Sequence, residues 1–220
     1  MSFRLLVKDE LRGFYKSKVM LFLWFGLPLL AILFHFWSSL QGSEFPLTTL
    51  SVIITSSIGG TLASVMLAVS IINEKTQHVY DLFLVRPVKR WNILLSKFLA
   101  VYTCIAVASG LSLLLGLIID NVNLGAISDI VLRDTLFSLA TSFSMMAVSS
   151  SIGVLIGVAS PSVLVGVILV IYGGNQISAL PIIPTILNIS NAALFSVTLG
   201  VVITSIMLFL AIYLFNRKQM

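Results

Sequence analysis

The chain has 220 residues, of which 58% are apolar and 10% are charged, and its mean hydropathy is +1.10. This composition excludes a water-soluble globular domain, because too few polar residues remain to cover a folded surface. The net charge of +5 comes from Lys and Arg at the edges of apolar segments rather than on a soluble surface, which excludes a nucleic-acid partner.

Residues 1–18 predict an amphipathic helix at the membrane surface. Apolar side chains recur on one arc of this helix, and basic side chains follow at i+4 along an adjacent flank, from Arg4 to Lys16. Such a helix lies in the headgroup layer, with its apolar side toward the acyl chains and its basic side on lipid phosphates. Glu10 falls inside the apolar arc and needs a partner. We expect it to reach solvent, to pair with cations near Lys16, or to contact the basic 86–90 loop or a second protein.

Six stretches approach the roughly 20 apolar residues that a helix needs to cross a hydrocarbon core about 30 Å thick. They are residues 19–40, 50–72, 98–119, 135–158, 162–180 and 192–214. The connections between them are too short for a soluble domain. We therefore expect an all-α integral membrane protein of six transmembrane helices, with residues 1–220 forming a single transmembrane domain.

The distribution of basic residues predicts the orientation. Every Lys and Arg except Arg133 falls before the first span, between the second and third spans, or after the last one. Basic residues near span ends are retained on the cytoplasmic side. Both termini are therefore expected in the cytoplasm, with the chain in the cell membrane.

Small residues form a stripe along the second span. Ser56, Gly60, Ser64 and Ala68 recur at i+4 spacing, which places them on one helix face. Helices in a membrane associate through small residues that let their backbones approach. We interpret this stripe as a helix-packing face, with the lining of a translocation path as the alternative.

The connection at residues 73–97 contains the most informative pattern. It predicts a polar helical extension, an amphipathic turn with Leu82 and Phe83 on one side, a stop at Pro87 and a new helix. A short element held by two rigid spans is suited to transmitting the movement of a partner protein.

Residues 175–191 interrupt the apolar pattern before the last span. Asn175 and Gln176 are followed by Pro181 and Pro184, which remove backbone donors. Irregular backbone at membrane depth is tolerated only where protein buries it or where it lines a cavity. We expect a short helical or re-entrant element at the outer face, which would form an outer gate.

The 73–97 connection resembles the cytoplasmic loop of ABC-2-type transporter permeases, whose pattern is E-[KR]-E-x-G-T-x-E-x-L-L-x-x-P-V-[ST]-R, followed by L-L-x-[GS]-K. The matching positions are Glu74, Asp81, Leu84, Pro87, Val88, Arg90 and Lys97. The sequence departs from the pattern at Thr76, His78, Val79 and Lys89.

This resemblance implies a half-transporter that exports a substrate. Such permeases pair with a second permease subunit, as a homodimer or heterodimer, and with two cytosolic ABC ATPase subunits. The N-terminal helix and residues 76–90 would receive the ATPase. The expected coupling residues are Glu10, Glu74, Asp81, Leu82, Phe83, Arg86, Pro87 and Arg90. The chain has no G-x-x-x-x-G-K-[ST] motif, so ATP and Mg²⁺ are expected in the partner ATPase and no cofactor or catalytic residue in this chain.

Two other classes of function stay open at this point. An ion-coupled secondary transporter is favoured by the Gly-Gly-Asn-Gln break at 173–176, because such proteins use discontinuous helices. A membrane enzyme would need grouped titratable residues. Its candidates outside the 73–97 connection are Glu44, Asp120, Asp129 and Asp134, and haem handling has only His35. The substrate, which could be a lipid, a peptide, a drug or a polyprenyl-linked sugar, is not chosen by any residue pattern.

Overall fold

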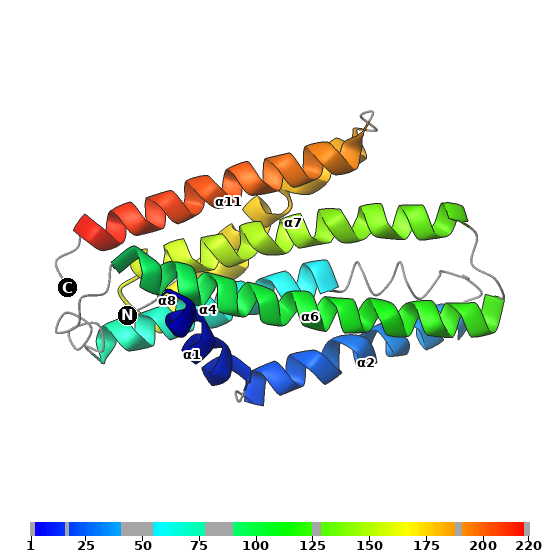
Figure 1. The fold of residues 1–220 in the computed structure, drawn as a ribbon, viewed down its shortest axis with the longest axis horizontal. Helices are drawn as coiled ribbons and strands as arrows, with labels where there is room; N and C mark the ends of the chain where they lie inside the picture. Colours follow the sequence, from blue (N-terminus) through cyan, green and yellow to red (C-terminus); the bar gives the residue numbers. More distant parts are fainter. Residues whose placement is uncertain are drawn as a thin grey trace.

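The computed structural model of the chain describes residues 3–15, 18–40, 55–77, 90–124, 129–187 and 191–217. Every regular element within these ranges is helical (Figure 1). In chain order they are α1 (Phe3–Tyr15), α2 (Lys18–Leu40), the π-helical turn η1 (Thr55–Gly59), α4 (Gly60–Thr76), α6 (Arg90–Leu124), α7 (Asp129–Ala159), α8 (Val163–Leu169), the π-helical turn η2 (Val170–Gly174), α9 (Asn175–Ser178), the 3₁₀ turn η3 (Leu180–Ile182), α10 (Ile183–Ile186) and α11 (Ala192–Arg217). The expected all-α architecture is confirmed.

Five helical stretches in the described part of the chain are long and apolar enough to cross a membrane. They are Ser57–Thr76, Trp91–Ile119, Thr135–Ala159, Val163–Ile182 and Ala192–Arg217. The remaining expected span, residues 19–40, corresponds to α2, a helix of 23 residues with Pro28 in its interior. That α2 crosses the membrane stays a prediction. Several apolar helices of this length are typical of a multi-pass membrane protein.

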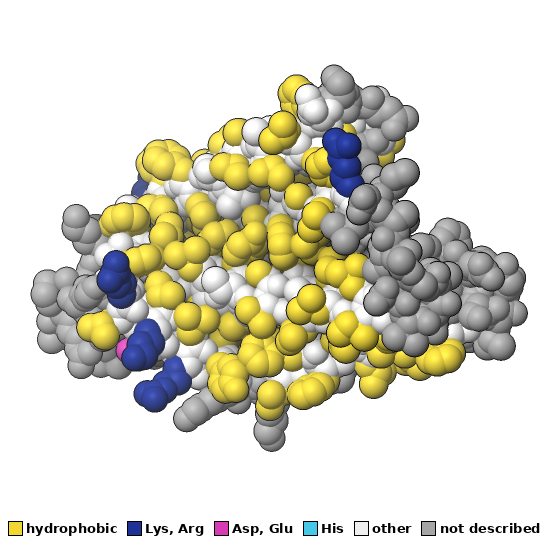
Figure 2. Space-filling view, turned by 45° about the vertical axis from the view of Figure 1, so that its right-hand side comes forward, with side chains coloured by type: hydrophobic (Ala, Val, Ile, Leu, Met, Phe, Trp, Pro, Cys, Tyr) yellow, Lys and Arg dark blue, Asp and Glu magenta, His cyan; other side chains and the backbone are white. Residues whose placement is uncertain are grey.

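The long helices lie side by side, and the surface between their ends is apolar. Figure 2 shows hydrophobic side chains across the middle of one face and Lys and Arg side chains toward its two ends. An apolar surface this extensive is unusual for a water-soluble monomer and fits a lipid environment. The helix α1 and the C-terminal end of α11 lie at the same end of the molecule (Figure 1).

Small residues bring α4 and α7 into close contact. A Cβ atom added to Gly153 of α7 would lie 2.5 Å from the carbonyl oxygen of Ser64 in α4, closer than real Cβ atoms come to other atoms. One turn along α7, the hydroxyl of Ser149 donates a 2.7 Å hydrogen bond to the carbonyl of Gly60. A Cβ on Gly157 would lie 3.1 Å from the Cα of Ala68. Three members of the stripe expected from the sequence therefore face α7, while the side chain of Ser56 lies outside the described residues.

The helix α7 packs against α11 in the same manner on another side. A Cβ on Gly200 of α11 would lie 2.6 Å from the Cβ of Ser144 in α7, so only glycine fits at this crossing. Around these contacts, buried side chains from α4, α6, α7 and α11 form one hydrophobic core, which includes Leu67, Val101, Met146 and Phe215. The helix α7 is consequently the most enclosed of the five candidate spans.

Part of the apolar side of α1 packs on other helices, and its placement at the membrane surface stays a prediction. Leu6 is buried, and Phe14 is partly buried against both hydrophobic clusters, so this part of α1 lies on protein. The helix α6 begins at Arg90, and its first half lies beside α1. The basic side chains Arg4, Lys8 and Arg12 are exposed, as expected.

Residues 163–187 form a succession of short helical pieces. Ser162 caps α8, because its hydroxyl oxygen accepts a hydrogen bond from the backbone N–H of Val165 at 3.5 Å. Pro181 lies in the first turn of η3, where the missing N–H costs little. The short helical element expected within 175–191 is therefore present. The described residues do not show a return into the membrane, so the re-entrant path stays a prediction.

Candidate functional site: a buried charge cluster

A lysine with almost no exposed surface joins three helices where α4 ends and α6 begins. The Nζ of Lys97 lies 2.9 Å from a carboxylate oxygen of Glu10 in α1 and 2.5 Å from one of Glu74 in α4. The Lys97 side chain is 3% exposed, and each carboxylate side chain is 24% exposed. Ser70 donates a 3.3 Å hydrogen bond to the same oxygen of Glu74. We call Glu10, Glu74 and Lys97 the charge cluster.

The cluster forms because two helices continue beyond their apolar spans. The helix α4 reaches Thr76 and α6 begins at Arg90, so Glu74 and Lys97 occupy fixed positions on helices. Leu94 and Val101, at i−3 and i+4 from Lys97, are both completely buried. Helical periodicity therefore places the lysine on the face of α6 that points into the protein.

The surroundings of Lys97 compensate for its burial. A buried ammonium group is costly unless it is paired and hydrogen-bonded, and Lys97 has two carboxylate partners. Two carboxylates and one ammonium group leave one net negative charge at this place. Both carboxylates keep some contact with solvent, which lowers the cost of that extra charge.

Lys75, which follows Glu74 in α4, contacts a different part of the protein. The Nζ of Lys75 donates a 3.4 Å hydrogen bond to the carbonyl of Ser160, just after α7 ends at Ala159. Lysine side chains commonly satisfy the free carbonyls at helix C-termini. The end of α4 is thus tied to α1 and α6 through Glu74 and to the α7–α8 connection through Lys75.

The structure brings together two of the expected coupling residues, Glu10 and Glu74, through Lys97. Arg90 begins α6, and its side chain lies outside the described residues, as do all atoms of Asp81, Leu82, Phe83, Arg86 and Pro87. Lys97 was matched to the family pattern but was not expected to pair with Glu10. One feature of the sequence could have indicated that Lys97 is buried, because apolar residues flank it at helical spacing on α6.

The four residues of the expected outer gate divide into two pairs. Asn175 and Gln176 of α9 are exposed, whereas Pro181 and Pro184 are buried. Amide side chains at the surface of an apolar span are costly against lipid, because hydrocarbon supplies no hydrogen-bond partners. The 175–176 pair therefore favours contact with water or with another protein.

Within the ranges that the structure describes, no group of three or more His, Cys, Asp and Glu side chains is arranged to hold a metal ion. The chain matches no protein-family model, and no curated protein shows significant similarity to it. The likeness to ABC-2-type permeases therefore rests on the residues of the 73–97 connection and on the order of the predicted elements.

Proposed function

We propose that this chain is the permease subunit of an ATP-binding-cassette exporter, driven by a separate cytosolic ATPase. The observation that carries the proposal is the contact between Glu74 and Lys97. These residues occupy the first acidic position and the final lysine of the ABC-2 loop pattern, and they lie on the two helices that flank the 78–89 connection. Their pairing supports a connection that is anchored at both ends to the membrane helices.

In this proposal the ATPase docks on residues 76–90 and on α1. ATP and Mg²⁺ bind to the ATPase, because this chain has no Walker A motif. A push on the connection reaches α4 and α6 together, since the charge cluster joins their ends and adds α1 through Glu10. The close approach of Gly153 to Ser64 then passes the movement of α4 to α7.

The translocation path is proposed to lie beside α9, shared with a second permease subunit. The exposed amides of Asn175 and Gln176 support a polar surface at this position. The buried Pro181 and Pro184 support a fixed outer end to that surface, which we propose as the outer gate.

The decisive experiment is affinity purification of the chain from native membranes, followed by measurement of ATP hydrolysis in the complex. We expect a Walker A ATPase to co-purify with the parent protein. Glu74→Gln is expected to retain the ATPase and to lose most of the permease-dependent change in hydrolysis rate. Asp9→Asn is the matched control, because Asp9 is an exposed carboxylate on α1 outside the charge cluster.

Two results would overturn this proposal. The first is transport by the purified chain in vesicles that contain no nucleotide-hydrolysing protein. The second is a Glu74→Gln complex that behaves like the Asp9→Asn complex in both ATPase retention and hydrolysis rate.

An ion-coupled transporter is the second candidate, and one observation favours it. The π-helical turn at Val170–Gly174 leads directly into the exposed Asn175 and Gln176. Such turns frequently mark functional sites, and helix irregularities form ion sites in secondary transporters. An imposed Na⁺ gradient that drives uptake or export without ATP would select this candidate.

A further inference from the structure

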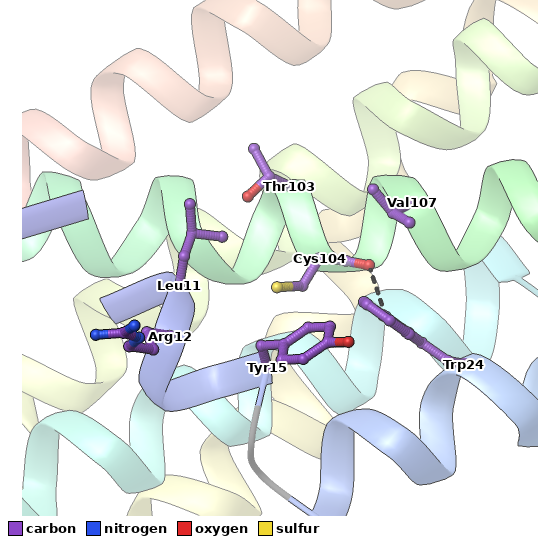
Figure 3. Close-up of a pocket in the computed structure, with 7 residues that line it drawn as sticks. All are labelled: Leu11, Arg12, Tyr15, Trp24, Thr103, Cys104 and Val107. Atoms are coloured by element: carbon purple, nitrogen blue, oxygen red, sulfur yellow. Dashed lines mark hydrogen bonds between the residues drawn. The ribbon is translucent and has the colours of Figure 1, made fainter. Parts of the chain in front are cut away.

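A pocket lies between α1, α2 and α6, next to the charge cluster but separate from it. Its volume is about 430 Å³, within the range of sites that bind small molecules. Seven residues line it: Leu11, Arg12, Tyr15, Trp24, Thr103, Cys104 and Val107. Figure 3 shows these side chains coming from all three helices.

The walls of the pocket are apolar and well fixed. The indole N–H of Trp24 donates a 3.3 Å hydrogen bond to the carbonyl of Cys104, which holds the Trp24 ring against α6. Tyr15 packs edge-on against Trp24 at 5.3 Å between ring centroids. The hydroxyl of Thr103 donates to the carbonyls of Leu99 and Ala100 within α6. The polar groups of the walls are thus largely occupied, and the interior presents carbon and sulfur.

One end of the pocket carries a positive charge. Arg12 is exposed, and in Figure 3 its side chain points away from the apolar walls. No ion pair involving Arg12 occurs among the described residues. Lys8 and Arg4 continue the same exposed flank of α1, at i−4 and i−8. The guanidinium group suits a phosphate oxygen, to which it donates two hydrogen bonds at once.

The far end of the pocket, at Val107, lies about one leaflet's depth from the charge cluster. The Glu10–Lys97 contact places α1 beside the start of α6, and Val107 lies about 15 Å further along α6 at 1.5 Å per residue. This length is about half of a hydrocarbon core. Val107 and Tyr15 are both more than half exposed, so the pocket opens sideways to the surrounding lipid.

We propose that this pocket binds one anionic phospholipid from the cytoplasmic leaflet. Its headgroup phosphate pairs with Arg12, and one acyl chain lies in the cleft between Trp24 and Val107. The cleft alone would accept any acyl chain. Arg12 favours a headgroup with net negative charge over one whose phosphate is balanced by a choline cation. This inference does not depend on the proposed function, because lipid binding is measured without an ATPase or a transported substrate.

The test uses Trp24 as a reporter. The chain is reconstituted in a Trp37→Phe, Trp91→Phe background, in which Trp24 is the remaining tryptophan. The vesicles contain phosphatidylcholine with a small fraction of phosphatidylglycerol, and bromine is placed on the acyl chains of one or the other lipid. Brominated phosphatidylglycerol is expected to quench Trp24 fluorescence at a lower mole fraction than brominated phosphatidylcholine.

Variants separate the headgroup contact from general surface attraction. Arg12→Gln is expected to lower the preference for the anionic lipid by about tenfold, because the charge-assisted hydrogen bonds to the headgroup are lost. Arg4→Gln is the matched control, because Arg4 lies on the same exposed flank but does not line the pocket, and it is expected to change the preference by less than about twofold. Val107→Phe narrows the cleft and is expected to reduce quenching by both lipids.

Three results would overturn the inference. They are equal quenching by the two lipids in the parent protein, the same loss of preference in Arg4→Gln as in Arg12→Gln, and unchanged quenching in Val107→Phe. Circular dichroism of each variant in the same vesicles shows whether the helices are intact, so that a loss of binding is assigned to the pocket.

Discussion

Lys97 is a charged side chain held out of water by two carboxylates on other helices. Removal of one partner from a buried ion pair is costly, because the remaining charge is left without compensation. Glu10 and Glu74 are not equivalent to Lys97 in this respect, since each of them shares a single ammonium group with the other. The lysine therefore contributes more to stability than either glutamate.

Lys97→Met is expected to lower the free energy of unfolding by about 3 kcal/mol, because two carboxylates would face each other without a cation. Glu10→Gln is expected to cost about 1 kcal/mol, since Glu74 still pairs with the lysine. Denaturant unfolding in detergent micelles measures both values. Lys8→Met, at an exposed position of α1, is the control.

The triple variant Glu10→Gln, Glu74→Gln, Lys97→Met checks the cause. Its stability is expected to exceed that of Lys97→Met, because the unpaired carboxylates are gone. A Lys97→Met protein as stable as the parent would contradict the stabilising role of the cluster.

Gly153 is the residue at which α4 and α7 come closest. Gly153→Ala is expected to lower stability by about 2 kcal/mol, because the new methyl group meets backbone atoms of Ser64 that cannot rotate away. Gly110→Ala is the matched control in α6, where a Cβ meets nothing within 4 Å. Thermal unfolding of the two variants in the same detergent measures the difference, and equal stability would contradict the close approach.

The pair of helices α4 and α7 also shares the hydrogen bond from Ser149 to Gly60. Hydrogen bonds between membrane helices contribute only about 0.6 kcal/mol on average. Ser149→Ala is therefore expected to destabilise the protein much less than Gly153→Ala in the same unfolding assay. The opposite order would show that the hydrogen bond, and not the close packing, holds these helices together.

The sequence predicted the helices better than it predicted their partners. Apolar length predicted the five helical stretches that are long enough to cross a membrane, and the i+4 repeat of Gly60, Ser64 and Ala68 predicted a packing face, because both depend on residues close together in the chain. Which helix packs against that face depends on the three-dimensional arrangement of all the helices, and a local sequence pattern does not specify that arrangement. The contact of α1 with α6 could not be predicted for the same reason, since the apolar side of α1 could cover either lipid or α6.

The charge cluster shows the same limit for the candidate site. Glu10 was recognised as a carboxylate that needs a partner, and Lys97 as a position of the family pattern. Their contact could not be predicted, because it requires α1 to fold back onto the start of α6. The pocket beside Arg12 likewise arises from three helices whose mutual placement no single segment specifies.

At the scale of the whole molecule, α1 and the C-terminal end of α11 lie at the same end, which fits the prediction that both termini are on the same side of the membrane. We expect Arg217→Cys, in a Cys104→Ser background, to react with a membrane-impermeant maleimide only in inside-out vesicles. Asn191→Cys, at the exposed turn before α11, is expected to react from outside intact cells, because α11 is long enough to cross the bilayer. Labelling of position 217 from outside would reverse the predicted orientation.

The pairing of Glu10 with Lys97 also has a consequence for biosynthesis. The first helix leaves the ribosome long before the lysine that it needs has been translated. The helix α1 can therefore make its contact with Lys97 only after the two predicted crossings that separate them in the chain have been synthesised.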